Sequence, residues 1–342
     1  MITSRIDVPI AAHGGRAALG PDAQNVTDFS VCLNAFGPAD VVRAAVLYAD
    51  ISEYPDPESR LAREAASVAW RRPIEEIAFG AGASELLDAV CRAFLVPGDR
   101  VSIEMPAYNE YARAARLSGA VITPDLTSDA TLVFVCSPHN PTGAAYDAGQ
   151  LRALADECAA RGSLLVLDQS YDAFVDTPLG TPGIPGHPAV LHLRSLTKDH
   201  SLAGVRAAYA VGPRDVIAAM NSARLPWAAS TLAQAAAIAT FSSESQAHAA
   251  RTITLLRVEG RRLREACARL GYDVTPSATH FFLLRVASAP RAQKVLLDRA
   301  RILVRDCTSY GLDDRIRIGA RTPRENDQLI DALDRFSSEL RP

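Results

Sequence analysis

Short apolar runs alternate with helical patterns through the middle of the chain. Each apolar run has the length and composition of a buried strand, and several lead into stretches with apolar residues at helical spacing. The expected strands are Ile77–Phe79, Arg100–Ile103, Thr131–Cys136, Leu164–Leu167, Ala189–Leu193 and Ala207–Val211, and the expected helices between them are Ser84–Phe94, Tyr108–Ser118 and Ala148–Ala160. This alternation predicts an α/β fold with a mostly parallel sheet flanked by helices.

The pattern changes after about Pro226. A long helical tract, interrupted only weakly, extends from Ser230 to about Leu270. Beyond it we expect strands at Phe281–Arg285, Ile302–Arg305 and Ile316–Gly319 and helices at Ala289–Ala300 and Arg324–Leu340. The chain is therefore predicted to have a large domain at residues 47–226 and a smaller α+β domain formed by residues 1–46 and 227–342.

Composition and charge are those of an ordinary globular protein. Of 342 residues, 48% are apolar and 22% are charged, and the net charge is −3, so we expect neither nucleic acid nor a membrane as a partner. The apolar runs are too short to span a bilayer, and the first residues do not resemble a secretion signal. The six cysteines lie far apart without metal-ligand spacing, which favours buried thiols, no metal site and a reducing cytoplasm.

The strongest chemical signal is a lysine that follows a predicted strand. Lys198 ends the run Ser195-Leu196-Thr197-Lys198, and Arg206 follows eight residues later. Two hydroxyl groups and a guanidinium group are donors that suit a phosphate dianion, and a nearby cationic site favours the neutral, nucleophilic form of a lysine amine. An exposed lysine in a turn is the alternative for this residue taken by itself.

Polar residues follow two other predicted strands. Asp168 directly follows the expected strand Leu164–Leu167, at the edge where α/β sheets bind ligands, and a carboxylate there can keep a pyridinium nitrogen protonated. Tyr171 and Asn140, the latter in the turn Ser137–Gly143, could reach the phenolate oxygen of the same ring. Taken singly, Asp168 could equally be a helix N-cap, and Asn140 could belong to a plain Asn-Pro turn.

A glycine-rich turn and a tyrosine complete the candidate set. The turn Gly80–Glu85 lies between a predicted strand and a predicted helix, and the free N–H groups at a helix start suit a phosphate. Tyr108, in Pro106-Ala107-Tyr108, could stack on a flat ring or pack in the core. Together with Lys198, these features indicate pyridoxal 5'-phosphate as the cofactor.

In order and spacing, these segments resemble the class I and II aminotransferases of pyridoxal-phosphate fold type I, over nearly the whole chain. The resemblance implies that Lys198 is the Schiff-base lysine, Asp168 the partner of the pyridine nitrogen and Tyr108 the stacking aromatic. It further implies that the ring oxygen is bound by Asn140 and Tyr171. The implied phosphate cup consists of Ala81, Gly82, Ser195, Thr197 and Arg206.

The resemblance also implies a homodimer. Tyr54, in Tyr54-Pro55-Asp56-Pro57, resembles the tyrosine that this family contributes to the cofactor phosphate of the neighbouring subunit. If Tyr54 has this role, the two subunits share their active sites.

Both ends of the chain resemble one branch of the family. The N-terminal segments around His13 and Asn34 resemble threonine-phosphate decarboxylases, and the tail resembles both those enzymes and histidinol-phosphate aminotransferases. In that branch two tail arginines bind the carboxylate or phosphate of the substrate, and the matching positions here are Arg305 and Arg317. His13, Asn34 and Asn140 are further candidates for contacts with an amino-acid-type substrate.

Four positions depart from the family pattern. Ala81 stands where Asn is frequent, Ala35 where Pro is expected, Gln169 where Glu is common and His280 where Asn is usual. These departures leave cofactor binding intact but leave the identity of the substrate open. The roles of His13, His200 and His280 are open as well.

The fold does not select the reaction, because pyridoxal-phosphate chemistry depends on which bond to the α-carbon is perpendicular to the ring. We expect an aminotransferase, acting on an amino acid or a phosphorylated amino compound. A decarboxylase resembling threonine-phosphate decarboxylase is the main alternative, followed by another lyase or an oxidase. A pyridoxal-phosphate-sensing regulator is disfavoured because only about 50 residues precede Tyr54, and a sugar-aminating enzyme is disfavoured because the paired tail arginines suit an acid.

Overall fold

The computed structural model describes residues 8–9, 13–176 and 186–342. Its main feature is a seven-stranded sheet with the strand order β2-β8-β7-β6-β5-β3-β4. The strands β3 to β7 are parallel to one another, and β8 is antiparallel to both β2 and β7, which confirms the mostly parallel sheet. The strands are β2 (Ile77–Gly80), β3 (Arg100–Ile103), β4 (Val121–Thr123), β5 (Leu132–Cys136), β6 (Leu164–Asp168), β7 (Val190–Ser195) and β8 (Ala208–Val211).

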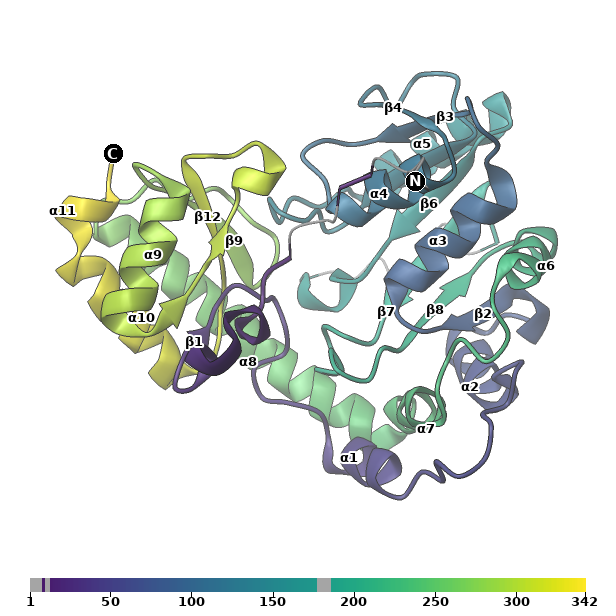
Figure 1. Ribbon diagram of the computed structural model, residues 1–342, viewed down its shortest axis with the longest axis horizontal. Helices are drawn as coiled ribbons and strands as arrows, with labels where there is room; N and C mark the ends of the chain where they lie inside the picture. Colours follow the sequence, from purple (N-terminus) through teal and green to yellow (C-terminus); the bar gives the residue numbers. More distant parts are fainter. Residues whose placement is uncertain (1–7, 10–12, 177–185) are drawn as a thin grey trace, which may run out of the picture.

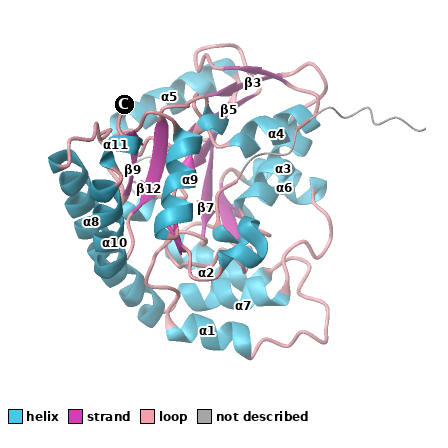
Figure 2. Cartoon of the chain, turned by 60° about the vertical axis from the view of Figure 1, so that its left-hand side comes forward, coloured by secondary structure: helices cyan, strands magenta, loops and turns pink. Residues whose placement is uncertain are grey.

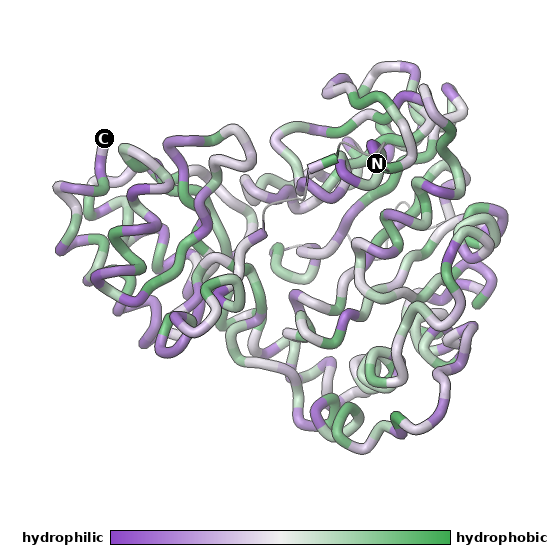
Figure 3. The backbone as a smooth tube through the Cα atoms, in the orientation of Figure 1, coloured by the Kyte–Doolittle hydropathy of each residue, from purple (hydrophilic) through white to green (hydrophobic). Residues whose placement is uncertain are grey.

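Helices cover both faces of this sheet (Figures 1 and 2). Successive side chains of a strand point to opposite faces, so Phe134 packs in the cluster of α3, α4 and α6, whereas Val133 and Val135 pack against α5. Since both faces are covered, strands such as β5 and β6 are nearly continuous apolar runs. Figure 3 shows how hydrophobic and hydrophilic stretches alternate along the whole chain. The covering helices are α3 (Ala83–Phe94), α4 (Asn109–Leu117), α5 (Ala148–Arg161) and α6 (Arg214–Ala223).

A second, smaller sheet has the order β11-β12-β9 and is antiparallel. Its core contains Phe282, Leu284, Ile316 and Ile318, which pack against helices on the side of the molecule that also carries the C-terminus (Figure 1). The elements are α8 (Ser243–Arg269), β9 (Phe281–Arg285), α9 (Ala289–Ala300), β11 (Arg305–Asp306), β12 (Arg315–Gly319), α10 (Pro323–Arg335) and α11 (Ser337–Leu340). The N-terminal segment joins this part through β1 (Thr27–Asp28), which pairs with β10 (Ile302–Leu303).

The long helical tract after Pro226 consists of two helices. The helix α7 (Thr231–Thr240) ends before Ser242, whose hydroxyl accepts a hydrogen bond from the N–H of Ser245 and so caps α8. This side-chain cap starts a new helix where the apolar pattern shows only a weak interruption.

Two helices from outside residues 47–226 pack on the large sheet. The helix α1 (Asp40–Leu47) and the helix α7 contribute Val42 and Ala236 to a cluster with Ile77 and Phe79 of β2, which also includes Trp70 of α2 (Arg60–Trp70). The division into domains at residues 46/47 and 226/227 therefore stays a proposal. Within the described part of the chain, no helix has the length and hydropathy needed to cross a membrane.

Candidate active site

The segments with candidate chemistry meet at one edge of the large sheet. The strands β5, β6 and β7 lie side by side and parallel, so their carboxyl ends share this edge. The turns that follow them carry Asn140, Asp168 with Tyr171, and Lys198, which together line a cavity of about 110 Å³. Predicted site residues from three distant segments are thus brought together.

Lys198 lies in the turn after β7 and faces this cavity. Burial lowers the pKa of its amine, and the positive charges of Arg317 and Arg206 act in the same direction. The neutral amine is the nucleophilic form of lysine, so the surroundings of Lys198 favour a covalent link to a carbonyl group. The chain contains only one other lysine, the exposed Lys294 in α9, where it pairs with Asp298.

The carboxylate of Asp168 is held by three donors among the described residues. Its Oδ1 accepts hydrogen bonds from the N–H and the hydroxyl of Ser170, at 2.9 Å and 2.6 Å. Its Oδ2 accepts a 2.7 Å hydrogen bond from the hydroxyl of Tyr111. These three donors fix the orientation of the buried carboxylate, as a partner for a ring nitrogen requires.

The predicted phosphate cup gathers at the start of α3. Gly82 has a φ of +89°, which residues with side chains rarely adopt, and a Cβ at this position would lie 2.5 Å from Nη2 of Arg206. Glycine is therefore needed both for its backbone conformation and for the space that Arg206 occupies. Ser195, Thr197 and Arg206 line the cavity. The N–H of Ala81 donates to Glu85 Oε2 at 3.1 Å, and neither Ala81 nor Gly82 is among the residues that line the cavity.

The aromatic and amide candidates have well-defined contacts. Tyr108, directly before α4, lines the cavity, and its hydroxyl lies 3.3 Å from Oγ of Ser84. The Tyr171 ring centroid lies 5.5 Å from Nζ of Lys198, and burial raises the pKa of the Tyr171 phenol well above its ordinary value. The side-chain oxygen of Asn140 accepts a short hydrogen bond from Arg317.

The two tail arginines face each other across adjacent strands. Arg305 of β11 and Arg317 of β12 are register partners, and both are buried. Arg317 also donates to the main-chain oxygen of Ser30 at 2.8 Å, whereas Arg305 donates to Oγ of Ser309 at 2.8 Å. The contact between Arg317 and Asn140 joins the smaller sheet to the cavity at the edge of the large sheet.

Comparisons with known proteins agree with this geometry. Residues 24–333 match the family model described as aminotransferase class I and II. The chain belongs to the class I and II aminotransferase family. Its cofactor is the pyridoxal 5'-phosphate of that family, and the buried lysine, the hydrogen-bonded carboxyl group of Asp168 and the cationic cup at a helix start all fit this group.

Relatives of this aminotransferase-family chain differ in activity. It is 33% identical to histidinol-phosphate aminotransferase of Symbiobacterium thermophilum, over 88% of this chain and 87% of the relative. It is 31% identical to threonine-phosphate decarboxylase of Salmonella typhimurium, over 97% of this chain and 98% of the relative. A solved histidinol-phosphate aminotransferase from Sinorhizobium meliloti, in complex with pyridoxal-5'-phosphate, has a TM-score of 0.85 at 24% identity, with 95% of each chain covered, and shows the same fold.

Three other predicted residues lie away from the cavity lining. The side-chain amide of Asn34 donates to Asp199 O at 2.9 Å and to Thr252 Oγ1 at 2.8 Å, so it is occupied by protein groups next to Lys198. His13 is half exposed and lies 3.0 Å from Glu110 Oε1. Tyr54 is 80% exposed, and its ring lies 4.9 Å from that of Trp227. The substrate roles of Asn34 and His13 stay predictions.

The histidine that departs from the family pattern is fully buried. Burial, followed by the charges of Lys198 and Arg317, lowers the pKa of His280 to about 3, so its imidazole is neutral. Its ring lies 4.1 Å from that of Phe174.

Sequence reasoning did not single out Tyr111 and Ser170, which hold Asp168, or Cys136, which also lines the cavity. The available signal was the spacing of Tyr111, which lies three residues after Tyr108 and so falls on the same side of a helix.

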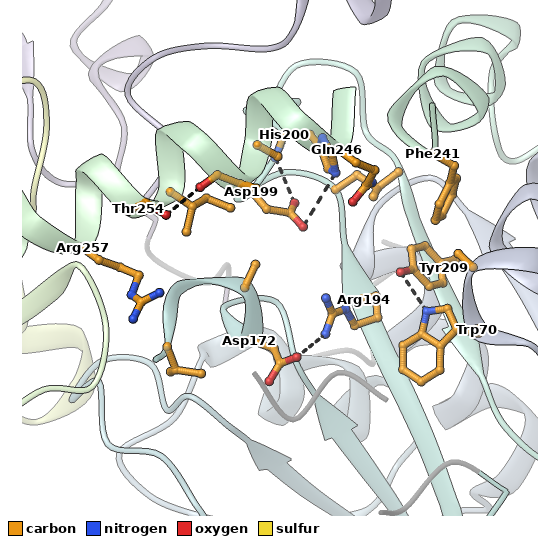
Figure 4. A pocket seen from close by; sticks show the side chains of 17 residues that line it. Trp70, Asp172, Arg194, Asp199, His200, Tyr209, Phe241, Gln246, Thr254 and Arg257 are labelled. Atoms are coloured by element: carbon orange, nitrogen blue, oxygen red, sulfur yellow. Dashed lines mark hydrogen bonds and ion pairs between the residues drawn. The ribbon is translucent and has the colours of Figure 1, made fainter. Parts of the chain in front are cut away.

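A second cavity, of about 580 Å³, lies beside the segment that follows Lys198 (Figure 4). Its lining includes Asp199 and His200, which directly follow Lys198, and the ion pair between Arg194 and Asp172 at 2.8 Å. Trp70, Tyr209 and Phe241 line another part of its wall. No residue predicted for the cofactor or the substrate is among the described residues that line it, so the smaller cavity is the candidate active site.

Proposed function

We propose that this chain is a pyridoxal-phosphate-dependent aminotransferase that acts on an amino acid or phosphorylated amino compound with an acidic group. The observation that carries the proposal is the pair Arg305 and Arg317, held on adjacent strands and joined to the cavity through Asn140. Guanidinium groups bind carboxylates and phosphates in two-point geometry, so this pair suits an anionic substrate rather than a neutral sugar.

The roles proposed for the residues are those that the resemblance to the family implies. Lys198 would hold the cofactor as a Schiff base, and when released its amine would move a proton to and from the α-carbon of the substrate. Asp168 would bind the ring nitrogen, and the bound cofactor would withdraw electrons from the α-carbon. Tyr171 and Asn140 would bind the ring oxygen, and Tyr108 would stack on the ring. The phosphate would be bound by Ala81, Gly82, Ser195, Thr197 and Arg206.

A homodimer with shared sites is part of this proposal. Large apolar side chains are exposed on neighbouring segments of one part of the surface, among them Leu47, Tyr48 and Ile51, which are 74%, 82% and 77% exposed. Tyr54 follows them and meets Trp227 on the same surface. Such a patch is typical of a protein interface, and burial against a second subunit would bring Tyr54 to that subunit's cofactor phosphate.

The proposed location is the cytoplasm. All six cysteines are free and buried, at positions 32, 91, 136, 158, 267 and 307. Free thiols in a chain of this size fit a reducing compartment, where a large core rather than disulfides stabilises the fold.

Decarboxylation is the second candidate reaction. It is supported by the decarboxylase relative, which aligns with 97% of this chain, whereas the 33% identical aminotransferase aligns with 88%. The two reactions differ in their products: an aminotransferase converts a 2-oxo acid into a new amino acid, whereas a decarboxylase releases carbon dioxide.

One experiment separates these candidates. The holoprotein is incubated with single amino acids and O-phospho amino compounds, with and without a 2-oxo acid, and both the new amino acid and the carbon dioxide are measured. Formation of a new amino acid without carbon dioxide supports the proposal. Release of carbon dioxide without amino transfer would favour the decarboxylase, and the absence of both products would show that neither reaction is right.

A further inference from the structure

The hydroxyl of Tyr111 is the only described side-chain donor to Oδ2 of Asp168, at 2.7 Å. Both residues line the candidate active site, although 57 positions of sequence separate them. Burial, followed by the negative charge of Asp168, raises the pKa of the Tyr111 phenol well above its ordinary value. The phenol therefore stays protonated and remains a donor.

The ring of Tyr111 is fixed by packing. It stacks on Phe134 of β5 with centroids 5.4 Å apart and an interplanar angle of 8°, and it meets the edge of Tyr108 at 5.5 Å and 84°. Tyr111 is also among the largest fully buried side chains of the protein. A buried ring held on two sides has one orientation, so its hydroxyl defines a fixed direction for the carboxylate.

Counting acceptor sites shows what remains free on Asp168. An ionised carboxylate has about four lone-pair sites, two on each oxygen. Ser170 occupies both sites on Oδ1 through its N–H and its hydroxyl, and Tyr111 occupies one site on Oδ2. Among the described contacts one acceptor site is left, on Oδ2, at a carboxylate that lines the cavity.

We propose that Tyr111 is a positioning residue that directs the last free acceptor site of Asp168 at the ring nitrogen of the cofactor. Ser170 fixes the other oxygen, so the carboxylate cannot rotate without losing hydrogen bonds at both ends. Because Tyr111 holds the Asp168 carboxylate in place before the cofactor binds, less conformational entropy of this side chain is lost on binding. This inference rests on the proposed function, because it takes Asp168 as the partner of the ring nitrogen.

The test compares two cofactors. Dissociation constants are measured by equilibrium dialysis for pyridoxal phosphate and for 1-deazapyridoxal phosphate, in which a C–H group replaces the ring nitrogen. Tyr111→Phe keeps the stacked ring and removes only the hydroxyl. We expect this change to weaken binding of pyridoxal phosphate about tenfold and binding of the deaza compound less than about twofold, since a hydrogen bond to a charged group has roughly this effect.

Tyr272→Phe is the matched control, because it also deletes a buried phenol hydroxyl, one that donates to Leu333 O at 2.9 Å within the smaller part of the molecule. It should leave both dissociation constants unchanged. Thermal unfolding of each variant checks that it is folded. If Tyr111→Phe does not fold, Ser170→Ala tests the same carboxylate from Oδ1, again with a loss expected for pyridoxal phosphate alone.

Each other outcome has a definite meaning. An equal loss of affinity for both cofactors means that Tyr111 serves packing only. Tighter binding of pyridoxal phosphate means that the phenol competes with the ring nitrogen for the carboxylate. Either result overturns the inference, and so does an unchanged affinity for both cofactors. If the unaltered protein binds pyridoxal phosphate in none of these assays, the proposed function fails instead. The two failures are therefore distinguishable.

Discussion

Arg317→Lys is the sharpest test of the proposed substrate class. Arg317 is 6% exposed, and its two terminal nitrogens donate to Asn140 Oδ1 and to Ser30 O, the latter at 2.8 Å. Its Nε has no hydrogen-bond partner among the described residues. The guanidinium group thus holds two distant segments together, and one of its buried N–H groups has no protein partner among the described residues.

A lysine could not replace these contacts. Its ammonium group is a single point of charge without the planar fork, so it could not hold Asn140 and Ser30 and bind a carboxylate or phosphate in two-point geometry. A hydrogen bond to a charged group contributes about 1.5–3 kcal/mol, and the variant should lose one or two of them. We therefore expect a loss of about 2–4 kcal/mol in transition-state stabilisation, or a kcat/KM about 30-fold to 1000-fold lower.

The assay is steady-state kinetics with the substrate that the unaltered protein turns over fastest. The visible spectrum of the bound cofactor should be unchanged, because Arg317 is not among the described residues that line the cofactor cavity. Arg321→Lys is the control: Arg321 is half-buried and donates to Asp28 O at 3.0 Å and to Glu325 Oε1 at 2.8 Å, away from that cavity. Its substitution should change kcat/KM less than about twofold.

Two results would refute this reasoning. If Arg317→Lys has the kcat/KM of the unaltered protein, the arginine does not bind the substrate acid and the substrate class is open again. If Arg317→Lys and Arg321→Lys lose the same activity, the effect comes from the packing of the smaller sheet and not from substrate recognition.

Three further outcomes are expected. Borohydride reduction of the holoprotein followed by peptide mapping should label Lys198 and not Lys294; a label on Lys294 would contradict the assignment. Asp168→Ala should retain some cofactor but lose about 100-fold or more in turnover, because the compensating charge at the ring nitrogen is lost; near-normal turnover would exclude that role. Mixing Tyr54→Phe with Lys198→Ala chains should restore activity, since one site of each mixed dimer has both native residues, and inactive heterodimers would disprove the cross-subunit role.

The sequence by itself determined the large sheet and the chemistry at its edge. A strand covered on both faces must be apolar at every position, so β5 and β6 stand out as runs that end abruptly in polar residues. Asp168 could be found because it comes directly after the apolar residues of β6, and Lys198 because it lies three residues after the end of β7. Functional residues of this kind can be recognised in the sequence because the strand, the turn and the functional residue are neighbours along the chain.

Only the tertiary structure decided which distant residues meet. Tyr111 and Asp168 are 57 positions apart, and Arg317 and Asn140 are 177 positions apart, so no local pattern records either contact. The same holds for α1 and α7, since nothing in their own sequences specifies that they pack against β2 of the large sheet. Periodicity specifies which side of an element is apolar, whereas the partner of that side, and the polar contacts made beside it, depend on how the whole chain packs.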